Sequence, residues 1–310
     1  MDSNSLLWCG DMVCPMSMGD PVLDGDPRVL QQLIKVERIQ GKSFRHINSR
    51  CYFKEAQEEV QPFMRRTLAK WMMEVCEEQG AEEILFPLAV SYVDRFLSVV
   101  RIRKTQLQLL GAVCLLIASK LRQCRSLTVD SLIYYTDYSV TTKDITTWEL
   151  LVLSSLKWDV ATPIASDFVD PLLSRMNLNG EEESLVKKHA HTFIALCATE
   201  YKFTSYSASL LATACIAVAI NGITWLQKPW GSLSALLESL TELAELNIKY
   251  LQACIEDVED LIATNIAQLK QAVSKSMTAQ TQSNTLNCSM TVNGLKTKTD
   301  VNSDVQDAIF

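Results

Sequence analysis

The stretch LQLLGAVCLLIASKL, residues 107–121, is apolar on nearly every face and rich in small side chains. A helix that is apolar all round belongs in the centre of a bundle, where other helices cover it from every side. Gly and Pro are scarce in the whole chain, with 10 and 8 among 310 residues, and this scarcity also favours helix. The sequence therefore predicts an all-α fold in which this segment is central.

Amphipathic patterns flank the central segment on both sides. Before it, an apolar stripe over residues 60–75 predicts one helix, and Pro87 marks the start of a second. After it, helices are expected over residues 128–135 and 144–157. These segments surround the central helix with partners for its apolar surface.

The same succession of segments returns about a hundred residues later. The run LLATACIAVAI, residues 210–220, is again apolar all round and rich in small residues. The matching pairs are 109–119 with 210–220, 86–94 with 193–201, and 145–158 with 248–261. The sequence therefore predicts a duplicated helical domain.

The two ends of the chain differ from this repeat. Asp26-Pro27 is an N-cap followed by a first-turn proline, which predicts a short helix that ends before Gly41. After Lys270 the chain is rich in Gln, Ser, Thr and Asn, and a disordered tail is expected. The expected boundaries are an N-terminal segment 1–51, a first helical domain 52–160, a second 161–266 and the tail 267–310.

Composition excludes several classes of function. The formal net charge of −7 disfavours binding of nucleic acid through its phosphates. Ten scattered cysteines without a Cys-x-x-Cys pair, and three histidines, predict free thiols in a reducing compartment and no metal site. No signal peptide opens the chain, and the longest apolar run is too short to span a membrane, which needs about twenty residues. We expect an intracellular protein with no cofactor and with no nucleic-acid or membrane partner.

Four charged residues stand inside apolar helical segments: Arg65, Asp94, Lys120 and Glu149. Such side chains are rarely fully buried unless they are paired. They could point to water, pair with one another, or line the mouth of a partner-binding site.

Several motifs make a family resemblance specific. Residues 64–78, MRRTLAKWMMEVCEE, resemble the opening helix of a cyclin box. The order and spacing of further motifs resemble the same family over about residues 52–160: YVDRFLS (92–98), LQLLG (107–111), ASK (118–120), YYTD (134–137) and ELLVL (149–153). HAHTFIALCAT, residues 189–199, resembles the D-type (G1) cyclins in particular. The resemblance covers about residues 52–263.

The resemblance implies a cyclin fold of two tandem five-helix domains. It also implies an activating, regulatory subunit of a G1 cyclin-dependent kinase, with no catalytic residues of its own, that promotes phosphorylation of retinoblastoma-family proteins and G1/S progression. Packing of a rigid surface against the kinase αC helix would hold its glutamate close to the β3 lysine. Two alternatives stay open: a cyclin-fold transcription adaptor, or an atypical cyclin that binds a kinase without activating it.

The resemblance also assigns the kinase-binding residues. Lys120 and Glu149 are expected to bond kinase backbone, because an ammonium donates and a carboxylate accepts hydrogen bonds. An apolar floor around them is assigned to Leu121, Leu153, Trp158 and Val160, with ordinary domain core as the alternative. Arg65 and Asp94 are expected to form an internal ion pair that braces Lys120 and Glu149, with direct kinase contact as the alternative.

A second expected site is the cyclin hydrophobic patch that docks Arg-x-Leu motifs of substrates and kinase inhibitors. Its matching residues are Met64, Leu68, Trp71, Glu74, Leu107 and Gln108. Glu74 would pair with the arginine of the motif while apolar side chains accept its leucine. Thr67 stands where the family has an aliphatic residue, and we expect a buried hydroxyl there to weaken the groove.

Two further expectations concern the ends of the chain. Leu7, Cys9 and Asp11 resemble the Leu-x-Cys-x-Glu motif by which D-type cyclins bind pocket proteins, with Asp in place of Glu. Thr297 resembles the phosphorylated threonine of the D-type tail, but Lys298 replaces the proline that follows it in the family. The expected location is the nucleus and the cytoplasm, with nuclear entry alongside a partner.

Overall fold

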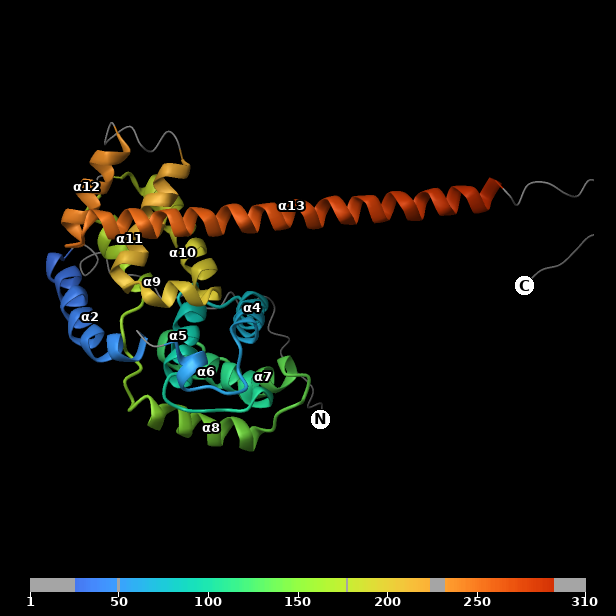
Figure 1. The fold of residues 1–310 in the computed structure, drawn as a ribbon, viewed down its shortest axis with the longest axis horizontal. Coiled ribbons are helices and arrows are strands. Elements are labelled where there is room, and N and C mark those ends of the chain that lie inside the picture. Colours follow the sequence, from blue (N-terminus) through green and yellow to red (C-terminus); the bar gives the residue numbers. More distant parts are fainter. Residues whose placement is uncertain (1–25, 49–50, 177, 224–231, 293–310) are drawn as a thin grey trace, which may run out of the picture. The chain divides into compact units, whose positions relative to one another are not determined.

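The computed structural model describes residues 26–48, 51–176, 178–223 and 232–292, and no strand is found in these ranges. The helices, in chain order, are α2 (Pro27–Asn48), α3 (Tyr52–Glu55), α4 (Pro62–Glu78), α5 (Leu85–Leu97), η1 (Lys104–Gln106), α6 (Leu107–Arg122), α7 (Val129–Tyr135), α8 (Thr142–Ser155), α9 (Ala165–Leu173), α10 (Gly180–Thr199), η2 (Tyr201–Ser205), α11 (Ala208–Gly222), α12 (Leu233–Leu243) and α13 (Ile248–Val292). The predicted all-α fold is confirmed (Figure 1).

Helices α4 to α8 form the first five-helix domain. The central segment is α6, which packs against the other four helices (Figure 1). It buries every residue from Leu109 to Ser119. Gly111 lets α4 come close, because a Cβ atom at this position would lie 2.8 Å from Leu68 Cδ1. Close helix packing therefore depends on the missing side chain, as expected for a central helix rich in small residues.

A buried amide closes the end of this domain. The Gln57 Nε2 donates to the carbonyl oxygens of Leu97 and Val100, at 2.6 and 2.7 Å, and its Oε1 accepts from the Ile102 backbone N–H at 3.2 Å. Leu97 is the last residue of α5, and Val100 and Ile102 lie in the segment after it, so this one side chain satisfies three backbone groups where the helical hydrogen-bond pattern has ended.

Helices α9 to α13 form the second five-helix domain. Its central helix is α11, which packs against α9, α10 and α12 and buries almost all of its residues. The predicted duplication is thus confirmed, since α6 and α11 take the same central place in their domains.

Helix α2 begins where the sequence predicts, at Pro27, and Asp26 Oδ1 accepts a hydrogen bond from the Arg28 backbone N–H at 2.9 Å. The helix continues beyond Gly41 to Asn48, so the expected end was too early. One glycine inside a helix is tolerated at a penalty of about 1 kcal/mol. Helix α2 packs against α9 and α11 of the second domain.

The C-terminal part also differs from the prediction. The residues up to Leu261 form one compact unit, while α13 continues helically as far as Val292, into the region expected to be a disordered tail. No Gly or Pro interrupts the sequence between Ile248 and Val292, so each residue can join the helical hydrogen-bond pattern. Among the described helices, none has a stretch apolar enough to cross a membrane.

Candidate functional site

Lys120 and Glu149 lie side by side on neighbouring helices. Lys120 is in the last turn of α6 and Glu149 is in the middle of α8, and Lys120 Nζ donates to Glu149 Oε1 at 2.5 Å. The Lys120 side chain is 49% exposed and that of Glu149 is 19% exposed. The ammonium therefore has further donors, and the carboxylate further acceptor capacity, for a partner that approaches this surface.

The start of α8 is set by a capping box. Thr141 Oγ1 accepts from the Asp144 backbone N–H at 3.2 Å, and Asp144 Oδ2 accepts from the Thr141 backbone N–H at 2.9 Å. The bond between them lowers the pKa of the Asp144 carboxyl. This local cap fixes where the helix begins and so which side chains reach Lys120.

The four residues of the predicted apolar floor divide into two kinds. Leu121 and Trp158 are exposed, at 42% and 63%, and are available to a partner. Leu153 and Val160 are half-buried against the core of the first domain, which corresponds to the alternative reading.

Sequence reasoning missed two exposed leucines on α8. Leu150 is 60% exposed and Leu151 is 42% exposed, immediately after Glu149. The buried residues of this helix are Ile145 and Val152, so both leucines lie outside the face of α8 that packs on the core. That departure from the periodic pattern was the signal available in the sequence. We call the surface made by Lys120, Leu121, Glu149, Leu150, Leu151 and Trp158 the α6–α8 face.

The turn after α8 presents Trp158 in an unusual backbone conformation. Lys157 and Trp158 have φ angles of 55° and 60°, a left-handed region that non-glycine residues seldom adopt. The Tyr92 hydroxyl donates to the Val160 carbonyl at 2.6 Å and holds the end of this turn on α5. Strained positions of this kind persist only where surrounding contacts fix them, and they are frequent at functional surfaces.

Arg65 and Asp94 form the predicted internal ion pair. Arg65 Nε and Nη2 donate to the two Asp94 oxygens at 3.1 and 2.7 Å, and the Arg65 side chain is 2% exposed. Arg65 Nη1 also donates to the Ala198 carbonyl at 2.7 Å, and the Tyr52 hydroxyl donates to Asp94 Oδ1 at 2.9 Å.

These partners give the pair a role that the sequence did not predict. Ala198 lies in α10 of the second domain, so the ion pair joins the two domains. Among the described residues, its hydrogen bonds do not reach Lys120 or Glu149, so the expected bracing of that pair stays a prediction.

The residues of the predicted docking patch lie along α4 and the start of α6. Leu68 and Leu107 are buried, Met64, Trp71 and Gln108 are half-buried, and Glu74 is exposed. Trp71 Nε1 donates to the Tyr135 carbonyl at 3.3 Å, so α7 borders the patch. Tyr134 and Tyr138 next to it are 62% and 72% exposed, and sequence reasoning missed them.

Thr67 does not bury its hydroxyl, contrary to expectation. Its side chain is exposed, and its Oγ1 donates to the Phe63 carbonyl one turn earlier at 3.0 Å. The side chain points away from the helical core because Arg65, Leu68 and Ala69 occupy the buried face of α4.

Two predicted sites cannot be placed in the structure. Leu7, Cys9 and Asp11, and also Thr297, lie outside the described residues. Among the described residues, no three His, Cys, Asp or Glu side chains gather as metal ligands would.

Comparisons with known proteins agree with this architecture. Residues 29–161 match the family model of the cyclin N-terminal domain, and residues 163–290 match that of the cyclin C-terminal domain. The chain is 45% identical over 271 residues to a G1/S-specific cyclin-D3 of Bos taurus, covering 86% of this chain and 88% of that protein. It is 41% identical over 278 residues to a G1/S-specific cyclin-D2 of Gallus gallus, covering 89% and 93%. Among solved structures, a viral cyclin from herpesvirus saimiri superposes with a TM-score of 0.65 at 26% identity, covering 76% of this chain and 97% of the viral protein. The chain belongs to the cyclin family, and within it to the D-type, G1/S-specific cyclins.

Proposed function

We propose that this D-type cyclin acts as the regulatory subunit of a G1 cyclin-dependent kinase and binds the kinase through the α6–α8 face. The observation that carries the proposal is the pair of half-exposed Lys120 and partly exposed Glu149, with exposed Leu121, Leu150 and Trp158 around it. As a regulatory subunit, the chain promotes G1/S progression through the activity of its kinase.

The chemistry of the face suits a grip on a helix of the kinase and its flanking backbone. Lys120 supplies N–H donors for carbonyl oxygens, and Glu149 supplies acceptors for N–H groups. The exposed apolar side chains supply the area that loses water on association, and a central tryptophan is a frequent energetic anchor of such interfaces. A helix held in this way keeps its glutamate near the kinase lysine, which selects the active state.

The test is charge reversal of Lys120 with a matched control in the second domain. Lys187 is also half-exposed and its Nζ lies 2.7 Å from Asp170 Oδ1, so it forms a similar surface ion pair away from the α6–α8 face. We expect Lys120→Glu to lose co-purification with a G1 cyclin-dependent kinase, and Lys187→Glu to retain it. Both variants should keep the helicity of the parent, and their melting temperatures should fall by similar small amounts, because each replaces a partly exposed ion pair by two like charges and such pairs contribute about 0–1 kcal/mol.

A swapped variant, Lys120→Glu with Glu149→Lys, separates the ion pair between α6 and α8 from the hydrogen bonds that each side chain offers to the kinase. It keeps an ion pair between α6 and α8 but exchanges the positions of donor and acceptor, so kinase binding should remain defective. Kinase binding by folded Lys120→Glu protein would refute the site. A phosphorylation assay on the wild-type complex distinguishes an activating cyclin from one that binds the kinase without activating it.

The docking patch supports retinoblastoma-family proteins as substrates and kinase-inhibitor proteins as further partners. Glu74 is exposed and can meet an arginine, while Trp71 and Met64 offer half-buried apolar surface. We expect Glu74→Lys to raise the KM for a peptide that carries an Arg-x-Leu motif and to leave a peptide without it unaffected. Glu77→Lys, an exposed charge reversal on the same helix, is the control. Equal effects on both peptides would refute the patch.

The terminal motifs belong to the same proposal. Leu7, Cys9 and Asp11 would add a contact to pocket proteins, which Cys9→Ala in a pull-down with a pocket protein tests. Phosphorylation of Thr297 by a proline-directed kinase is not expected, because Lys298 follows it. The proposed location in nucleus and cytoplasm is tested by imaging a fluorescent fusion. A transcription adaptor receives no support from the cyclin-D3 and cyclin-D2 relatives reported above, since both are named G1/S-specific cyclins.

A further inference from the structure

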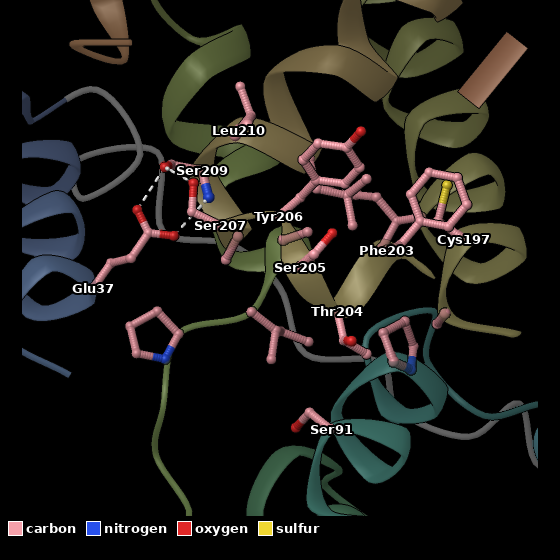
Figure 2. A pocket seen from close by; sticks show the side chains of 18 of the residues that line it. Glu37, Ser91, Cys197, Phe203, Thr204, Ser205, Tyr206, Ser207, Ser209 and Leu210 are labelled. Atoms are coloured by element: carbon pink, nitrogen blue, oxygen red, sulfur yellow. Dashed lines mark hydrogen bonds between the residues drawn. The ribbon is translucent and has the colours of Figure 1, made fainter. Parts of the chain in front are cut away.

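A cavity of about 580 Å³ lies away from the α6–α8 face, between the two helical domains and α2. Its walls come from α2, α5, the linker before α9, α10, and the segment from η2 into α11 (Figure 2). Cavities of about 300–1,000 Å³ at domain boundaries are the usual sites for small organic molecules. Size and position therefore make this cavity a candidate binding site.

The cavity wall is largely apolar, and its charged side chains already have hydrogen-bond or ion-pair partners. Side chains such as Val90, Phe203 and Leu210 supply apolar surface. Glu37 on α2 accepts from both the backbone N–H and the hydroxyl of Ser209, at 2.9 and 2.5 Å (Figure 2). Further charged side chains of the wall have partners: Arg38 with Glu245, Arg65 with Asp94, Arg95 with Asp159 and Glu200 with Arg66. A neutral ligand fits such a wall better than an anion, because the arginines of the wall are already paired with carboxylates and an anion would be buried without a counter-charge.

Three hydroxyls and one amide of the wall have oxygen atoms that can accept hydrogen bonds. The hydroxyls of Ser91, Thr204 and Ser205 each donate to a backbone carbonyl three residues earlier, at 2.7, 2.8 and 2.7 Å. With the proton used, each hydroxyl oxygen keeps lone pairs that can accept a hydrogen bond. Gln40 Oε1, also on the wall, is buried and has no hydrogen-bond partner among the described residues. Figure 2 shows Ser91 on α5 and Thr204 and Ser205 on the segment from the second domain.

We infer that this cavity binds a neutral small molecule with an apolar body that donates hydrogen bonds. Its body fills the apolar space between the domains, and its N–H or O–H groups meet the acceptor oxygens of Ser91, Thr204, Ser205 and Gln40. A buried acceptor without a partner destabilises the unliganded protein, so a ligand that supplies the donor is favoured over one that cannot.

The experiment uses the full chain and two probes, indole and 1-methylindole, followed by saturation-transfer NMR titration. Indole has one N–H donor, and the methyl group of 1-methylindole removes it with little change of the apolar body. We expect saturable binding of indole, and binding of 1-methylindole about fivefold to tenfold weaker, as the loss of one hydrogen bond implies. Equal affinity for the two probes, or no saturable binding of indole, overturns the inference.

Variants locate the binding within the cavity. Ser91→Phe should fill the space and weaken indole binding at least tenfold, a change typical of a blocked pocket. Thr192→Phe is the control, because Thr192 is an exposed residue of α10 whose hydroxyl also donates to a backbone carbonyl one turn earlier. Thr204→Val keeps the shape but removes an acceptor, so it should reduce the preference for indole over 1-methylindole even if Ser91→Phe fails to fold. Unchanged indole affinity in folded Ser91→Phe, or unchanged preference in Thr204→Val, overturns the assignment.

Discussion

The ion pair between Arg65 and Asp94 should be the most sensitive polar contact of the fold. Arg65→Met keeps an unbranched side chain of similar length but removes the guanidinium. Asp94, whose side chain is 11% exposed, then stays in its place without a cation. The Ala198 carbonyl in the second domain loses a donor at the same time.

The expected magnitude follows from burial. Removing one partner of a buried ion pair lowers the free energy of unfolding by about 3–5 kcal/mol, because a desolvated charge remains. The same change at an exposed pair has an effect of about 0–1 kcal/mol. Arg101 and Glu58 form such a pair at 2.5 Å, with side chains 57% and 70% exposed, and Arg101→Met is therefore the matched control.

Urea unfolding followed by circular dichroism measures the difference. Arg65→Met should shift the midpoint strongly, while Arg101→Met should leave it nearly unchanged. The double variant Arg65→Met with Asp94→Asn should recover about 2 kcal/mol, because the amide carries no charge and still accepts from Tyr52. If Arg65→Met and Arg101→Met destabilise equally, or the double variant is less stable than Arg65→Met, the pair does not act as a buried charge pair.

Three other perturbations address separate parts of the molecule. Gln57→Met should lower the free energy of unfolding by about 3 kcal/mol in urea titrations, because buried backbone groups lose their partner; a change below 1 kcal/mol would contradict this. Gly111→Val should lower it by about 2 kcal/mol, because the new side chain would enter the space of Leu68, and unchanged stability would show that the helices can separate freely. Burial lowers the pKa of His191, so below about pH 6.5 the folded protein binds fewer protons than the unfolded chain, and stability should fall from pH 7 to pH 5. His191→Gln should flatten that slope, and an identical slope in the variant would remove His191 as its source.

The helices and their order were accessible to sequence reasoning because the information is local. Each helix prediction rested on residues within one segment. The N-cap at Asp26 predicted a helix start, and the all-apolar run from Leu107 and its second copy predicted buried helices. Motif order then placed Lys120 and Glu149 on one surface, and the structure has them in contact. The extent of the final helix was missed, since composition argued for disorder while the absence of Gly and Pro allows helix as far as Val292.

By itself, then, the sequence determined an all-helical, duplicated cyclin fold and the charged pair on its first domain. The tertiary structure alone decided that Arg65 reaches Ala198, 133 residues away, and that Glu37 binds Ser209 across 172 residues. It also decided which apolar side chains stay exposed on α8, and it formed the cavity between the domains. The physical reason is the separation of the interacting residues along the sequence. Helix formation depends on neighbouring residues, whereas burial and side-chain partners depend on which distant segments pack together.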